Sequence, residues 1–236
     1  MNGCGHVYNC PQKDRKKYQL PKTEGGHIEA IMKMGPRLQR WSEEPFVTAL
    51  TESLFKLDYG QDRAFANSIL LRLADAFRTG NNFVRFCVLK VFLLELKKRH
   101  CHENGNNYKG ILAKERVPNH LEMVKRVKEV YKSGDIVARS LALQVLGCLA
   151  DLAKDSAEIQ RLIVDAIDSP YLLEVNAALF AAGCFCEFSK DFSSIILKKA
   201  IQMVNAMKTI PETNLGAIRL FAKMVHSPTL ARVAHE

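Results

Sequence analysis

Two short groups of cysteine and histidine residues have side chains that could bind a metal ion. A structural zinc site needs about four such ligands, with two of them usually paired as Cys-x-x-Cys. Neither group has that spacing, so the sequence predicts no metal and no cofactor. The groups are Cys4, His6 and Cys10, and His100, Cys101 and His102.

The remaining cysteines lie within apolar stretches of helical character. Cys184 and Cys186 are two residues apart, so on a helix they face different directions and cannot share a metal without other ligands. Together with Cys87 and Cys148 they are expected to be small hydrophobic residues of the core. We see no secretory signal peptide, and seven cysteines without a disulfide pattern favour a reducing compartment.

Residue patterns that would indicate catalysis are weak. Asp151, Asp155 and Glu158 are close in sequence, but they fall where one predicted helix ends and the next begins, a usual place for acids. The break at 80–82 lacks the Lys-Ser/Thr pair of a phosphate-binding loop. We therefore predict that the chain is not an enzyme.

Basic residues are clustered, and the chain carries a formal charge of +9. One cluster lies within residues 13–22. The other is a candidate basic surface for a partner. Solvated loops explain both clusters as well, and a nucleic-acid surface usually adds aromatic residues that stack on bases. The candidate surface consists of Lys97, Lys98, Arg99, Lys109, Lys114 and Arg116.

The elements that position these residues are predicted to be helices throughout. Apolar residues recur at helical spacing from about His27, and no stretch shows the alternation of a strand. Pro36 is expected to kink or split the first helix. Gly80 and Gly134 should end helices, with Asn81 or Asn82 and then Asp135 capping the next ones. Further helices are predicted at 46–55, 64–77, 83–98, 118–131, 135–154, 159–167, 172–189, 191–207 and 214–225.

An amphipathic helix followed by a nearly all-apolar helix recurs along the chain. When Gly147 is aligned with Gly183, the same frame fits 83–98 and 215–224, so copies lie roughly 36–54 residues apart. One pair cannot hide its apolar helix, so neighbouring pairs must stack. The sequence predicts an all-α fold, a HEAT/armadillo-like α-solenoid of stacked helix pairs.

The predicted domain organisation has two parts. Residues 1–26 are expected to be a disordered or atypical N-terminal extension, and residues 27–236 a helical repeat domain with a polar loop at 100–116. No charge-free apolar stretch is long enough to span a membrane.

Three blocks within this domain resemble the Integrator complex subunit 7 family. They are ILLRLADAFRTGNNFVRFCVLKVF (69–92), VARSLALQVLGCLADLA (137–153) and LEVNAALFAAGCFCEFSKDF (173–192). Their order and spacing also match, and the last two look most similar to plant-type members. The resemblance extends over about 28–231. Residues 1–26 do not look like the start of the family, and its repeats continue beyond 236, so we expect a fragment, a short isoform or a truncated product.

The resemblance implies a nuclear, non-catalytic scaffold. In that family, partners are other Integrator subunits and, indirectly, the RNA polymerase II machinery, in small nuclear RNA 3′-end processing and transcription termination. Two alternatives stay open from the residues themselves: a repeat protein that binds nucleic acid directly, or a transport or vesicle adaptor, because such folds have many roles.

Overall fold

A computed structural model describes residues 24–43, 61–102, 111–114, 117–206 and 216. Within these residues the regular elements are all α-helices, which confirms the all-α prediction. The helices are α2 (Glu24–Glu43), α4 (Gln61–Thr79), α5 (Asn82–His102), α6 (His120–Ser133), α7 (Ile136–Cys148), α8 (Ala150–Ala153), α9 (Ala157–Ile167), α10 (Leu172–Cys186) and α11 (Lys190–Ala206).

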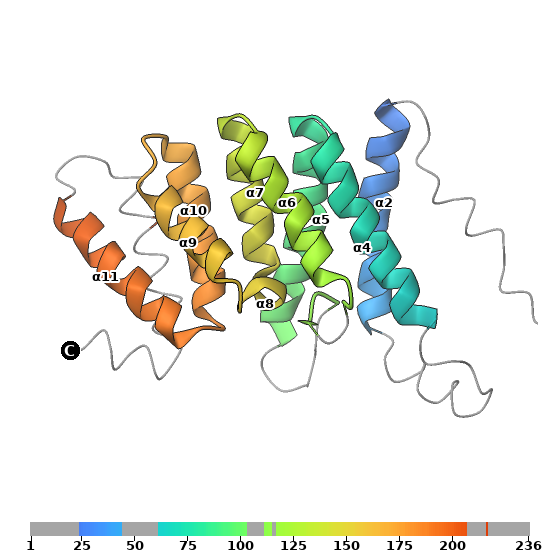
Figure 1. The fold of residues 1–236 in the computed structure, drawn as a ribbon. Helices are drawn as coiled ribbons and strands as arrows, with labels where there is room; N and C mark the ends of the chain where they lie inside the picture. Colours follow the sequence, from blue (N-terminus) through green and yellow to red (C-terminus); the bar gives the residue numbers. More distant parts are fainter. Residues whose placement is uncertain (1–23, 44–60, 103–110, 115–116, 207–215, 217–236) are drawn as a thin grey trace, which may run out of the picture.

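The helices form two layers that run side by side along one row (Figure 1). One layer contains α4, α6, α9 and α11, and we call it the outer layer. The other contains α2, α5, α7 and α10, and we call it the inner layer. Three of the outer helices pack on the inner helix that follows them, in the pairs α4–α5, α6–α7 and α9–α10. This arrangement is consistent with an α-solenoid; the assignment to HEAT or armadillo repeats stays a prediction.

The core lies between the two layers and between successive pairs. Phe77, Phe92, Phe185 and Phe192 are among its largest fully buried side chains. Phe185 of α10 and Phe192 of α11 lie with their ring centroids 5.8 Å apart, which joins two consecutive helices. Burial of each such side chain is worth about 1.5–3 kcal/mol, so the core is the main source of stability.

The inner helices α7 and α10 approach each other closely at Gly147. A Cβ atom added at Gly147 would lie 3.0 Å from Ala181 Cα and 3.0 Å from Phe180 Cε1. The absence of a side chain at this position therefore lets the two backbones come together. Cys148, Cys184 and Cys186 are buried around this contact region, and Cys87 is buried in α5, as the sequence predicted.

Local sequence determines where several helices begin and end. Gly134 follows α6, and a Cβ there would lie 2.5 Å from the Ala138 side chain. Asp135 then caps α7, because its carboxylate accepts a hydrogen bond from Ala138 N at 2.7 Å. Asn81 caps α5 in the same way by accepting from Val84 N at 3.0 Å. The predicted stops at glycine and caps at Asn81 and Asp135 are confirmed.

Two predicted helices differ from the structure. Of the two outcomes predicted for Pro36, a kink or a split, the split is wrong, since α2 continues on both sides of it with Ile31 and Leu38 buried; the kink stays a prediction. The helix predicted over 135–154 is interrupted at Leu149, whose ψ of 16° departs from the helical value of about −42°. The residues that follow form the short α8.

Several predicted features lie wholly or partly outside the described residues. Of the N-terminal extension, 1–23 lie outside and 24–26 begin α2. Of the predicted loop 100–116, residues 100–102 belong to α5, and Ile111, Leu112 and Ala113 are buried. The helix predicted at 46–55 lies outside. Of the one predicted at 214–225, Gly216 is described: it is helical and lies against α10, where an added Cβ would meet Leu179.

Candidate protein-binding surface

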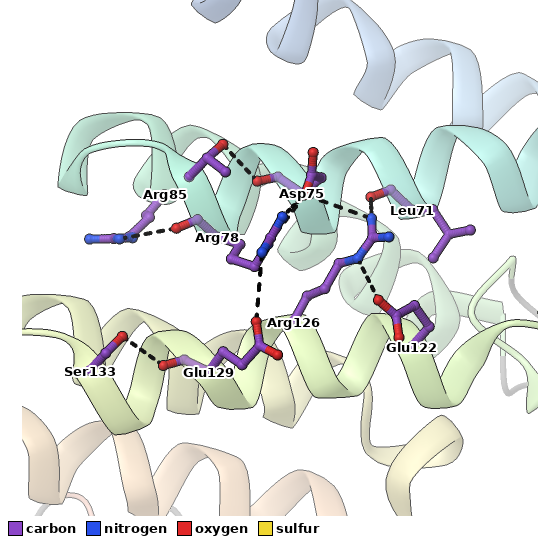
Figure 2. A network of polar contacts seen from close by, with 9 residues as sticks. Leu71, Asp75, Arg78, Arg85, Glu122, Arg126, Glu129 and Ser133 are labelled. Atoms are coloured by element: carbon purple, nitrogen blue, oxygen red, sulfur yellow. Dashed lines mark hydrogen bonds and ion pairs between the residues drawn. The ribbon is translucent and has the colours of Figure 1, made fainter.

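Polar contacts join outer helices α4 and α6 (Figure 2). Arg126 Nη1 donates to Leu71 O at 2.9 Å and lies 3.9 Å from Asp75 Oδ1. The same Asp75 oxygen accepts from Arg78 Nη2 at 2.8 Å, and Arg78 Nη1 lies 3.9 Å from Glu129 Oε2. The hydrogen bond that Arg78 donates to Asp75 raises the pKa of Arg78, so its guanidinium stays charged. These contacts join the outer helices of two consecutive helix pairs.

Ion pairs continue along the outer layer beyond α6. Lys128 and Lys132 of α6 contact Glu158 of α9 at 2.7 and 3.2 Å. Lys199 of α11 contacts Asp168 at 2.5 Å, just after α9. The hydrogen bonds from Lys128 and Lys132 lower the pKa of Glu158 below its usual value. Neighbouring outer helices therefore contribute charges of opposite sign to each contact.

A buried carboxylate joins the inner helices α7 and α10. Glu174 of α10 has a side chain that is only 4% exposed, and its Oε2 accepts from Arg139 Nη2 of α7 at 3.0 Å. Ser169 Oγ donates to the same oxygen at 2.7 Å. Burial is the largest cause that raises the pKa of Tyr131 to about 12, and the negative charge of Glu174 and a hydrogen bond to Glu174 raise it further. The tyrosine therefore stays neutral at physiological pH and completes this contact.

The structure places the predicted basic surface only in part. Lys97 is exposed near the end of α5, and Lys98 and Arg99 follow it on the same helix. Lys114 Nζ contacts Asp155 at 2.6 Å, and Lys114 N donates to Asp151 Oδ2 at 3.3 Å. The hydrogen bond from Lys114 lowers the pKa of Asp155. Lys109, Arg116 and the basic cluster at 13–22 lie outside the described residues, so this surface stays a prediction.

The three acids that formed a weak catalytic pattern in the sequence, Asp151, Asp155 and Glu158, form structural contacts. Asp151 Oδ1 accepts from Lys154 at 3.0 Å, while Asp155 and Glu158 pair with lysines. Among the described residues, no three histidine, cysteine or acidic side chains are close enough to hold a metal ion. The group at 4–10 and the side chains of 100–102 lie outside the described part of the chain. None of the described helices combines the length and apolar character needed to cross a bilayer.

The sequence did not predict an exposed stripe on α5. This helix was expected to be buried on most sides because it is apolar nearly all round. In the structure, five positions along one side of it are exposed: Phe83, Phe86, Lys90, Leu94 and Lys97. We call these five residues the α5 stripe. The sequence signal that could have identified the stripe is its spacing of three, four, four and three residues, because positions so spaced share one face of a helix.

Comparison with known proteins identifies the family. The family model described as Integrator complex subunit 7, N-terminal, matches residues 63–236. The chain belongs to this family. Integrator complex subunit 7 of Danio rerio is 38% identical to it over 170 residues, which cover 72% of this chain and 16% of the zebrafish protein. The Homo sapiens protein is 36% identical, with the same shares of the two chains covered. The Dictyostelium discoideum homolog is 34% identical over 72% of this chain and 15% of its own length.

Membership of the Integrator complex subunit 7 family agrees with the resemblance seen in the sequence. The family match includes α4 to α11 and therefore both layers beyond α2. The chain spans about one sixth of the length of the curated relatives it matches. The similarity to plant-type members stays a prediction.

Proposed function

We propose that the chain is a non-catalytic scaffold segment of the Integrator complex, acting in the nucleus. Membership of the Integrator complex subunit 7 family is the observation that carries this proposal. In this role it supports small nuclear RNA 3′-end processing and termination by RNA polymerase II. Its direct partners are other Integrator subunits, and its contact with the polymerase machinery is indirect.

The fold supports the same role. Ion pairs between outer helices and the buried contact between Arg139 and Glu174 join successive helix pairs and favour a rigid arrangement. A scaffold needs this rigidity because ordering a flexible surface on binding costs free energy. We also propose that helices α2 to α11 belong to one helical repeat domain, with residues 1–23 as a separate extension and a polar loop within 103–110.

Affinity purification of the tagged chain from nuclear extract, followed by mass spectrometry, tests the proposal. We expect Integrator subunits to be enriched over a tag-only control, and a fluorescent fusion to accumulate in the nucleus. Enrichment of transport cargo or coat proteins in place of Integrator subunits would support the adaptor alternative and contradict the scaffold.

A second candidate function is direct binding of nucleic acid. The charge of +9 and the exposed Lys97 favour it, whereas Lys114 already pairs with Asp155. A salt titration of binding to a single-stranded RNA separates the two functions, because several phosphate contacts give a steep fall in affinity with salt. A steep slope that becomes shallower on neutralising Lys97, Lys98 and Arg99 would support nucleic-acid binding.

A further inference from the structure

The α5 stripe is an ordered, partly apolar surface on the inner layer. Phe83, Phe86 and Leu94 are 59%, 42% and 49% exposed. From Phe83 to Lys97 the helix rises about 20 Å, close to the length of a four-turn helix. A large hydrophobic residue exposed alone is ordinary, but three on one side of one helix form an apolar ridge, here interrupted by Lys90.

The other sides of α5 are covered. The helix packs against α2, α4 and α7, and Val88, Leu89 and Phe92 are among its buried residues. The α5 stripe is therefore the side of α5 that these neighbours leave uncovered. Because its backbone is held by three helices, the stripe requires little ordering when a partner binds.

The charge around the α5 stripe is positive. Lys90 Nζ lies 4.7 Å from the centroid of the Phe86 ring, so a cation and an aromatic side chain share one site. The sequence of α5 contains five lysines and arginines and a single acid, Glu95. Glu95 is buried and accepts a hydrogen bond from Ile111 N at 2.9 Å, so it faces away from the stripe.

Two acids on or beside the neighbouring helices are already in contacts of their own. Glu29 of α2 pairs with Lys33 of the same helix. Asp135, the residue before α7, accepts hydrogen bonds from Asn82 Nδ2 at 3.0 Å and from Ala138 N. It therefore lies near the end of the α5 stripe that Phe83 occupies. The two lysines of the stripe are at positions 90 and 97, so the positive charge increases toward the end of α5.

We propose that the α5 stripe binds an acidic amphipathic helix of a partner protein. Apolar residues of the partner spaced i, i+3, i+4 and i+7 pack on Phe86 and Leu94, and its aspartates or glutamates lie beside Lys90 and Lys97. Three of the five stripe residues are apolar, and Leu94 offers no ring for a base, so a protein segment fits better than nucleic acid. This proposal names a partner chemistry for the scaffold and rests on that proposed function.

A binding titration with the full chain tests the proposal. The probe is a fluorescent amphipathic peptide of about 16 residues, with leucines on one face and glutamates on both flanks. We expect saturable binding, weakened about tenfold or more by Phe86→Ala with Leu94→Ala. Lys90→Glu with Lys97→Glu should weaken it similarly and should instead favour a peptide with lysines in place of the glutamates.

Matched controls lie on the outer helix α6, where Leu121 and Lys125 are exposed. Leu121→Ala with Lys125→Glu should leave peptide binding unchanged, and circular dichroism should show all variants equally helical. The proposal is overturned if the unmodified chain does not bind the peptide, or if stripe variants bind as well as controls. It is also overturned if a single-stranded RNA displaces the peptide and loses affinity on the same substitutions.

The two proposals can fail separately. If the tagged chain enriches Integrator subunits but the peptide titration fails, the scaffold stands and the acidic-helix partner is wrong. If the peptide binds as expected but no Integrator subunit is enriched, the scaffold within that complex is wrong.

Discussion

At the scale of single residues, Glu174 is a charged side chain in a poorly solvated environment. It is nearly fully buried, yet it carries a charge that Arg139 and Ser169 compensate at 3.0 and 2.7 Å. A buried ion pair is not a large net source of stability, because both charges lose hydration. Removing one partner is costly, however, since the other charge then lies in a poorly solvated place.

Glu174→Gln should therefore destabilise the protein by about 2 kcal/mol, below the 3–5 kcal/mol of fully buried pairs. The value is lower because the Arg139 side chain is 31% exposed and water compensates part of its charge. Urea denaturation followed by circular dichroism measures this loss. Asp165→Asn, an exposed substitution on α9, should change stability by less than about 0.5 kcal/mol. Equal effects of the two substitutions would show that the buried pair is unimportant.

At the scale of elements, close packing and helix caps determine how neighbouring helices meet. Gly147 allows α7 and α10 to come together, while Asp135 links the start of α7 to α5 through Asn82. Both features act at a junction between helices, so their loss should affect the stacking of pairs more than the helices themselves.

Gly147→Ala is expected to destabilise the protein by about 1 kcal/mol. Overpacking costs about 1–3 kcal/mol, and the better helix propensity of alanine offsets part of it. Asn176→Ala is the control, because Asn176 is exposed on α10 and the substitution raises helix propensity without adding an atom to the contact at Gly147. The control should be neutral or stabilising in thermal unfolding. A stabilising Gly147→Ala would mean that α7 and α10 separate easily.

Asp135→Ala should cost about 1 kcal/mol, the usual effect of losing a helix cap. The substitution removes the acceptor for Ala138 N and for Asn82. Asp135→Asn keeps an oxygen acceptor and should retain most of the stability in the same denaturation experiment. If alanine and asparagine behaved alike, the hydrogen bond to Ala138 would not be the source of the effect.

At the scale of the whole molecule, the outer layer is joined by ion pairs that should make stability depend on pH. Hydrogen bonds from lysines lower the pKa of Asp155 and Glu158 in the folded chain. A lowered pKa contributes stability that is present above the unfolded value, 3.8 for Asp and 4.5 for Glu, and is lost as the pH falls through the folded value. Acid should therefore loosen the contact of α6 with α9 at Glu158 and the contact between Lys114 and Asp155.

Glu158→Gln should lower the melting temperature at pH 7, and the difference from the unmodified chain should shrink as the pH falls below 4.5. High salt should also reduce it, because exposed charges are screened. In a chain that also carries Lys128→Met and Lys132→Met, Glu158→Gln should lower the melting temperature less. The part that remains comes from the position of Glu158 in the first turn of α9. An effect independent of pH and of the two lysines would contradict ion pairing.

Local features of the fold were predictable from the sequence. The stops at Gly80 and Gly134 and the caps at Asn81 and Asp135 depend on residues within one helical turn, so their outcome does not need the rest of the chain. The burial of Cys87 and Cys148 followed from the apolar residues around them. The pairing of an amphipathic with an apolar helix predicted stacking, because such an apolar helix cannot remain in water.

Contacts between distant residues were decided by the tertiary structure alone. Arg139 and Glu174 are 35 positions apart, and Lys114 and Asp155 are 41 apart, so no local pattern links them. The α5 stripe could not be predicted from the sequence for a related reason. A helix that is apolar nearly all round does not reveal which side its neighbours cover, and only the positions of α2, α4 and α7 leave Phe86 and Leu94 exposed.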